Sequence, residues 1–122
     1  MPHMDEQLFK DRTKTLALRV MALVETLPHS RSADVIANQI LRSATSIGAN
    51  YRAACRAKSA ADMILKLKIV EEESDETLYW LELLSEGRKI SQDKVADLIK
   101  ETGEILAMTV ASIKTLRARN PK

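Results

Sequence analysis

The sequence predicts an all-α fold, an antiparallel up-down-up-down four-helix bundle formed by a single domain over residues 1–122. Its composition is the first indication: 45% of residues are hydrophobic but only 3% aromatic, and a core of Leu, Ile, Val, Ala and Met suits packed helices better than sheets. The second is periodicity, because apolar residues recur every three or four positions in four segments separated by Pro, Gly or Ser. Short connections between helices of similar length favour antiparallel neighbours.

The first two helices are expected at about residues 5–27 and 33–55. Pro28 ends the first because proline cannot continue a helix. Ser30 or Ser32 can cap the start of the second. The predicted core-facing residues of the first helix are Phe9, Thr13, Leu16, Val20, Leu23 and Leu27. Those of the second are Ile36, Ile40, Ser43, Ile47, Asn50 and Ala54.

The last two helices are expected at about residues 60–86 and 92–119. Ser59 and Ser91 stand at the N-cap positions, and Gly87 is a typical C-terminal stop. The predicted apolar line of the fourth helix is Val95, Ile99, Thr102, Leu106, Thr109, Ile113 and Leu116.

The third helix carries a second apolar stripe, opposite its core-facing side at 100° per residue. Isolated exposed apolar residues are ordinary on protein surfaces. A row in register, with the only Trp of the chain beside it, indicates a subunit interface instead. Carboxylates in its middle would then need partners. The predicted interface residues are Leu65, Ile69, Glu72, Glu76, Tyr79, Trp80 and Leu83.

The second helix carries three arginines on its outer side, Arg42, Arg52 and Arg56. Guanidinium groups pair well with both carboxylate and phosphate. The arginines therefore either meet Glu72 and Glu76 across an interhelix or intersubunit contact, or form an exposed track for RNA or DNA. The net charge of only +2 and the lack of interleaved aromatic residues favour the first interpretation.

Catalytic chemistry is poorly supported by the residues present. The two histidines, His3 and His29, lie in the tail and beside Pro28, so a di-metal bundle site and a histidine-activated nucleophile are excluded. The acidic run around Glu72 and Glu76 could assist a metal-dependent hydrolase, but its side chains spread around the helix, which favours a solvated or ion-paired face. We therefore expect no enzyme, no metal site and no cofactor.

The single cysteine, Cys55, excludes an intrachain disulfide and is typical of a reducing compartment. Its best interpretation is a small packing residue. No apolar stretch is long enough to span a bilayer, so the sequence predicts a cytoplasmic protein without a membrane partner. Met1 to His3 precede a second methionine and receive no functional weight.

Two segments carry a family resemblance, Gln39-Ile-Leu-Arg-Ser-Ala-Thr-Ser-Ile-Gly-Ala-Asn-Tyr-Arg52 and Lys66-Leu-Lys-Ile-Val-Glu-Glu-Glu-Ser-Asp-Glu-Thr-Leu-Tyr-Trp-Leu81. The chain resembles bacterial four-helix-bundle proteins encoded in intervening sequences of 23S ribosomal RNA genes. The resemblance implies a ring-like homopentamer and kinship with the accessory variability determinant of diversity-generating retroelements, which binds nucleic acid and a reverse transcriptase. Ala53 stands where many relatives have Glu. The signature positions are Gln39, Ser46, Gly48, Asn50, Lys66 and Glu73.

Two functional hypotheses follow. The leading one is a non-enzymatic homo-oligomer, pentameric by the resemblance, that serves as a scaffold and binds RNA or DNA weakly through Arg42, Arg52 and Arg56. The alternative is a protein-interaction adaptor without nucleic-acid binding, in which the arginines are used up in subunit contacts.

Overall fold

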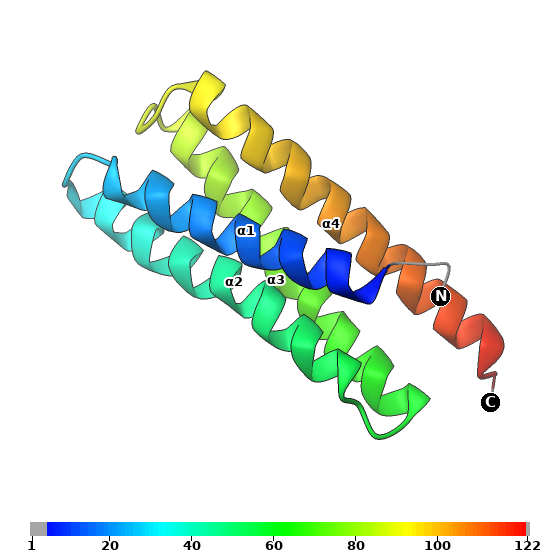
Figure 1. Cartoon of the computed structure of the whole chain (residues 1–122). Coiled ribbons are helices and arrows are strands. Elements are labelled where there is room, and N and C mark those ends of the chain that lie inside the picture. Colours follow the sequence, from blue (N-terminus) through cyan, green and yellow to red (C-terminus); the bar gives the residue numbers. More distant parts are fainter. Residues whose placement is uncertain (1–4, 122) are drawn as a thin grey trace.

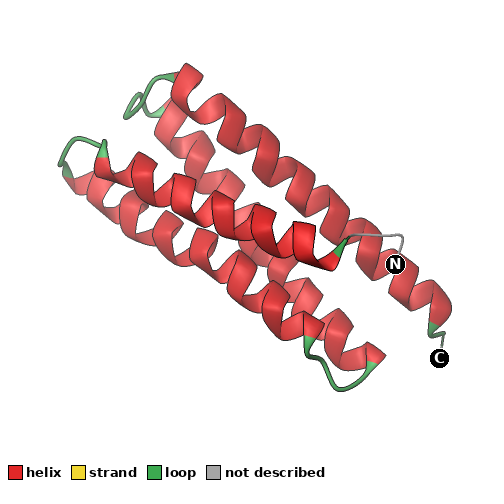
Figure 2. Cartoon of the chain, in the orientation of Figure 1, coloured by secondary structure: helices red, strands yellow, loops and turns green. Residues whose placement is uncertain are grey.

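Four helices make up the computed structural model, which describes residues 5–121 and contains no strand in that range (Figure 2). They are α1 (Glu6–Glu25), α2 (Arg31–Cys55), α3 (Ala60–Glu86) and α4 (Gln92–Arg119). Successive helices run in opposite directions along one common axis (Figure 1). The predicted all-α antiparallel bundle is therefore confirmed, and each helix end lies within two residues of its predicted position. Met1 to His3 lie outside the described residues.

Serine side chains start two of the helices. Ser30, rather than Ser32, is the N-cap of α2, and its Oγ accepts a hydrogen bond from the backbone N–H of Ala33 at 3.2 Å. Ser59 caps α3 in the same way, at 3.1 Å. Ser91 stands at the N-cap of α4 but makes no side-chain capping bond. Each capping bond satisfies a backbone donor that the helix itself cannot use.

Helix α3 ends at Gly87, its C-cap, as predicted. Gly87 has a φ of −80°, whereas the left-handed residue is Arg88, with a φ of 58°. The backbone N–H of Lys89 donates to the carbonyl of Leu84 at 2.9 Å, which closes a Schellman turn. Gly87 is needed for space instead, because a Cβ there would lie 2.8 Å from the carbonyl oxygen of Leu83.

All four helices contribute to one core of mostly aliphatic side chains. The largest fully buried side chains are Tyr51, Phe9, Leu16, Ile40, Ile47, Leu67, Leu81, Leu84, Ile105, Val20, Val70 and Val95. Buried threonines alternate with them, and their hydroxyls donate to carbonyls one turn back; for example, Thr102 bonds to the carbonyl of Leu98 at 2.7 Å. These polar groups can be buried because each has a partner.

The predicted apolar line of α4 is confirmed at Val95, Thr102, Thr109 and Ile113, which are buried, but not at every position. Leu98 and Ile105 are fully buried, whereas the predicted Ile99 and Leu106 are only partly buried. The difference arises because α4 packs against both α3 and α1, so its buried arc is wider than a single line.

The helices are packed unequally. The α2–α3 contact is the most extensive, and the α1–α4 contact the smallest. Helices α1 and α2 approach closely at Gly48, where a Cβ would lie 3.1 Å from Oγ1 of Thr13. None of the helices in residues 5–121 combines the length and the apolar character that crossing a bilayer requires.

Candidate functional site

A polar cluster joins α2 to α3 at mid-length. Arg42 forms ion pairs with Glu76 and, at 3.5 Å, with Oε2 of Glu73. The indole N–H of Trp80 donates to Oε2 of Glu76 at 3.1 Å. Both carboxylates raise the pKa of Arg42 above its ordinary value, the hydrogen bond to Glu76 most of all. The cluster therefore fixes these side chains within one chain.

The cluster contains one contact named in the first arginine interpretation, an interhelix pair between Arg42 and Glu76. Arg42 meets Glu76 across an interhelix contact within one chain, although its side chain remains 51% exposed. Glu72 is exposed and is not its partner; Glu73 takes that place, because one residue along a helix turns the side chain by 100° toward α2. Oε1 of Glu73 is buried and lacks a hydrogen-bond partner among the described residues.

The signature residues of α2 support the helix backbone along one side. Ser46 donates to the carbonyl of Arg42 at 2.7 Å, and Asn50 donates through Nδ2 to the carbonyl of Ser46 at 2.9 Å. Gln39 is partly buried. On α3, Lys66 pairs with the carboxylate of Asp62 one turn earlier, at 3.1 Å. These contacts are structural, and none of them forms a reactive group.

The predicted interface residues lie as the sequence pattern places them around α3. Leu65 and Tyr79 are 60% and 54% exposed, whereas Ile69, Trp80 and Leu83 are partly buried. The rings of Tyr79 and Trp80 pack edge to face, with centroids 5.1 Å apart.

Val35 on α2 extends this apolar surface, and sequence reasoning missed it. Arg42 lies beside Glu76, and the helices are antiparallel, so the residue two turns earlier on α2 lies beside Leu83, two turns later on α3. Val35 is 58% exposed. The spacing of Val35, Asn38 and Arg42 indicates that they lie on one side of α2. Only the alignment of α2 with α3 shows that Val35 adjoins the apolar stripe. We call the combined surface the α2–α3 face; its residues are Val35, Leu65, Ile69, Glu72, Tyr79, Trp80 and Leu83.

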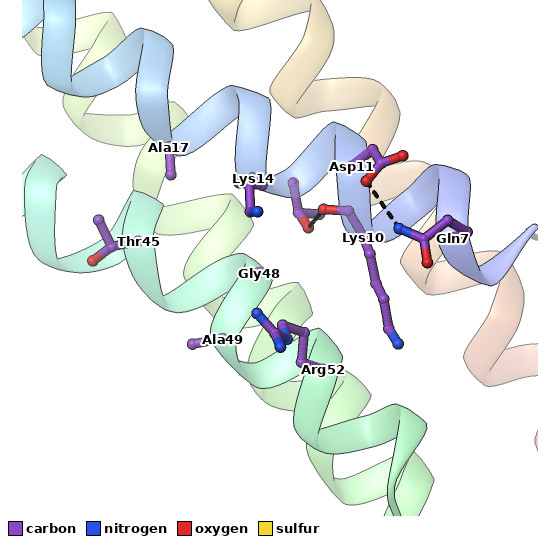
Figure 3. A pocket seen from close by; sticks show the side chains of 10 residues that line it. Gln7, Lys10, Asp11, Lys14, Ala17, Thr45, Gly48, Ala49 and Arg52 are labelled. Atoms are coloured by element: carbon purple, nitrogen blue, oxygen red, sulfur yellow. Dashed lines mark hydrogen bonds between the residues drawn. The ribbon is translucent and has the colours of Figure 1, made fainter.

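A groove of about 420 Å³ runs between α1 and α2. Lys10 and Lys14 of α1 line it together with Gly48 and Arg52 of α2 (Figure 3). Within residues 5–121, Arg52 and Arg56 have no carboxylate at ion-pair distance, unlike Arg42. Sequence reasoning missed both lysines because they lie on another helix. In the sequence, Gly48 indicates that another helix packs closely against the helix that carries the arginines. It does not identify that helix as α1.

The described residues offer little for catalysis. His29 is almost fully exposed at the α1–α2 turn, and its Nδ1 lies 3.3 Å from the carboxylate of Asp34. Cys55 is partly buried, and burial raises the pKa of its thiol, so the reactive thiolate is disfavoured. No group of three or more His, Cys, Asp or Glu side chains within residues 5–121 is arranged to hold a metal ion.

Comparison with known proteins agrees with this architecture. The sequence pattern of the 23S rRNA-intervening sequence proteins matches residues 6–111. The crystal structure of a protein of unknown function from the S23 ribosomal protein family of Bacteroides thetaiotaomicron is similar, with a TM-score of 0.83 and 39% sequence identity. That similarity covers 91% of this chain and 99% of the other. No curated protein matches the chain. The chain belongs to the family of 23S rRNA-intervening sequence proteins.

Proposed function

We propose that this protein is a non-enzymatic homo-oligomeric scaffold whose subunits meet through the α2–α3 face. The observation that supports it is the apolar character of that face, where Val35, Leu65 and Tyr79 are each more than half exposed. Completing their burial is worth roughly 1 kcal/mol per side chain, because full burial of a large apolar side chain contributes about 1.5–3 kcal/mol. Five subunits is the number that the family resemblance implies.

Substitution of Leu65, which at 60% is more exposed than Val35 or Tyr79, tests this proposal. Leu65→Asp would place a charge inside the subunit contact, so we expect the variant to be a folded monomer at concentrations where the wild type assembles. The matched control is Leu18→Asp on α1, because Leu18 is 56% exposed and lies outside the face. Analytical ultracentrifugation gives the mass, and circular dichroism verifies the fold. Assembly lost in Leu18→Asp but kept in Leu65→Asp would contradict the proposed interface.

A second candidate function is weak binding of RNA or DNA through Arg52 and Arg56. What favours it is that both guanidinium groups are exposed and lack a carboxylate partner within residues 5–121. Arg42 does not take part, because Glu73 and Glu76 hold it. An arginine without an internal partner retains all its donors for phosphate.

The competing adaptor hypothesis assigns the same arginines to subunit contacts. Charge reversal separates the two. If Arg52→Glu and Arg56→Glu weaken RNA binding while the oligomer keeps its mass, nucleic-acid binding is supported. If the variants lose the oligomer first and the wild type does not bind RNA at low salt, the adaptor hypothesis is supported. Gel-shift and light-scattering measurements on the same samples provide both results.

A further inference from the structure

The groove between α1 and α2 exists because small residues form its floor. Gly48 allows α1 to approach closely, because a Cβ at this position would lie 3.1 Å from Oγ1 of Thr13. Ala17 and Ala49 line the same space. Thr13 is buried, and its hydroxyl donates to the carbonyl of Phe9 at 3.0 Å, so it is not a free donor in the groove. Short side chains on the floor leave the longer ones at the margins to determine what can bind.

Positive charge dominates these margins. Lys10 and Lys14 stand one turn apart on α1, about 6 Å along the helix axis at 1.5 Å per residue. Arg52 faces them from α2. Asp11 is the one carboxylate among the lining residues, and it accepts a hydrogen bond from Gln7 at 3.0 Å. Three cationic groups therefore share the groove with one anionic group.

The three cationic side chains differ in whether they form an ion pair within the chain. Lys10 pairs with Glu6 at 3.1 Å, so part of its charge is balanced. Lys14 and Arg52 form no ion pair within residues 5–121 and can offer all their N–H groups to a ligand. Convergence of a lysine and an arginine from two helices is suited to an anion with several acceptor oxygens, as a phosphate has.

Two more cationic residues follow Arg52 in the sequence, although they do not line the groove. Arg56, the C-cap of α2, lies one turn after Arg52, and Lys58 follows in the loop that leads to α3. Aromatic side chains are absent from the lining, so bases would find no stacking platform. A row of cations without such a platform is suited to a chain of phosphates that is held by charge and not by base identity.

We propose that the α1–α2 groove, with Lys14, Arg52 and Lys10 as its phosphate contacts, binds the phosphodiester backbone of RNA without regard to sequence. The inference rests on the second candidate function, RNA binding, and adds its location and its partner residues on α1. It is independent of assembly through the α2–α3 face, because Lys10 and Lys14 lie on a helix outside that face.

Fluorescence anisotropy with a short fluorescein-labelled RNA tests the proposal on the full chain. At about 50 mM salt we expect Lys14→Glu and Arg52→Glu each to weaken binding about tenfold and to reduce the salt slope by about one. Lys94→Glu is the matched control, with the same change of charge on an exposed residue at the opposite end of the bundle. It should change affinity less than about twofold.

The possible results distinguish an error in the location of the RNA site from an absence of RNA binding. RNA binding that survives Lys14→Glu but is lost in Arg56→Glu would overturn the groove and leave RNA binding in place. Absence of RNA binding by the wild type at low salt would overturn both, while the mass of the oligomer would still test the scaffold proposal. Competition by inorganic phosphate distinguishes the sources of the ligand. If phosphate at millimolar concentration displaced all RNA while sulfate did not, the groove would be a free-phosphate site and the RNA assignment would be wrong.

Discussion

Replacing Arg12 by methionine tests how α1 is held against α4, the smallest helix contact of the bundle. Arg12 reaches from α1 to two carboxylates of α4. Its Nε and Nη2 donate to Glu101 at 2.9 and 2.7 Å, and Nη2 also donates to Glu104 at 2.9 Å. Nη1 lies 3.3 Å from the sulfur of Met108. Methionine keeps the apolar stem of the side chain and removes only the guanidinium group.

The expected loss follows from burial. Hydrogen bonds between charged groups contribute about 1.5–3 kcal/mol each when protected from water. Arg12 and Glu101 are each 23% exposed, but Glu104 is half exposed, so its share is small. Removing Arg12 also leaves the Glu101 carboxylate without its partner in a mostly buried place. We expect Arg12→Met to lower the free energy of unfolding by about 2 kcal/mol, discounted from that range for solvent screening.

Urea denaturation at fixed protein concentration measures this loss, because stability depends on concentration if subunits associate. The matched control is Arg31→Met, an exposed arginine at the start of α2 that should change stability by less than about 0.5 kcal/mol. A double-mutant cycle with Glu101→Gln should give a coupling energy of about 1 kcal/mol or more. Additive effects, or a loss no larger than that of Arg31→Met, would refute the assignment of Arg12 as the link between α1 and α4.

The same contact predicts a pH dependence. The hydrogen bond from Arg12 holds the pKa of Glu101 below its ordinary value of 4.5. Between the folded and the unfolded pKa the unfolded state therefore binds more protons, so stability falls as the pH falls. The contribution is fully present above the unfolded value and is lost as the pH passes down through the folded one. In acid titrations, the stability difference between wild type and Arg12→Met should narrow over this window; a difference that stays constant would contradict the cause.

Three further predictions concern the backbone. Gly103→Ala should raise the free energy of unfolding by about 1 kcal/mol, because no atom lies within 4 Å of its added Cβ and alanine favours helix. Gly48→Ala should fall short of that gain by about 1 kcal/mol or more, since its Cβ would press on the buried side chain of Thr13; equal values for the two substitutions would show that α1 and α2 are not tightly packed there. Arg88→Gly should stabilise by about 0.5–1 kcal/mol, because Arg88 has a positive φ that glycine adopts without strain. Thermal denaturation of each variant measures the change, and a loss at Arg88→Gly would count against the turn geometry.

The helix pattern could be predicted from the sequence because each boundary is marked locally. Pro28, Ser59 and Gly87 stand at or near chain reversals, and their effects depend on neighbours within a few residues. Details that depend on the turn as a whole could not be predicted. The residue with positive φ is Arg88 rather than Gly87, because a Schellman turn has its left-handed residue directly after the C-cap, and the C-cap is Gly87.

The candidate sites were harder to predict because they depend on which helices adjoin. Helical spacing placed Arg42 and Glu76 on suitable sides of α2 and α3, but only the register of the pair identifies Glu73 as the second partner. The lysines of the groove, Lys10 and Lys14, are ordinary surface residues of α1 in the sequence. They become candidate binding residues only in the structure, where α2 packs closely against α1 at Gly48 and Arg52 lines the same groove.

The mass of the wild-type protein in solution tests the central claim most directly. Multi-angle light scattering coupled to size exclusion, repeated over a range of protein concentrations, determines how many 13.7 kDa chains associate. Because Val35, Leu65 and Tyr79 form one exposed apolar face, we predict an assembly of several subunits, five if the family resemblance extends to its stoichiometry. A monomer at every concentration would contradict the scaffold proposal and leave the α2–α3 face without its proposed occupant.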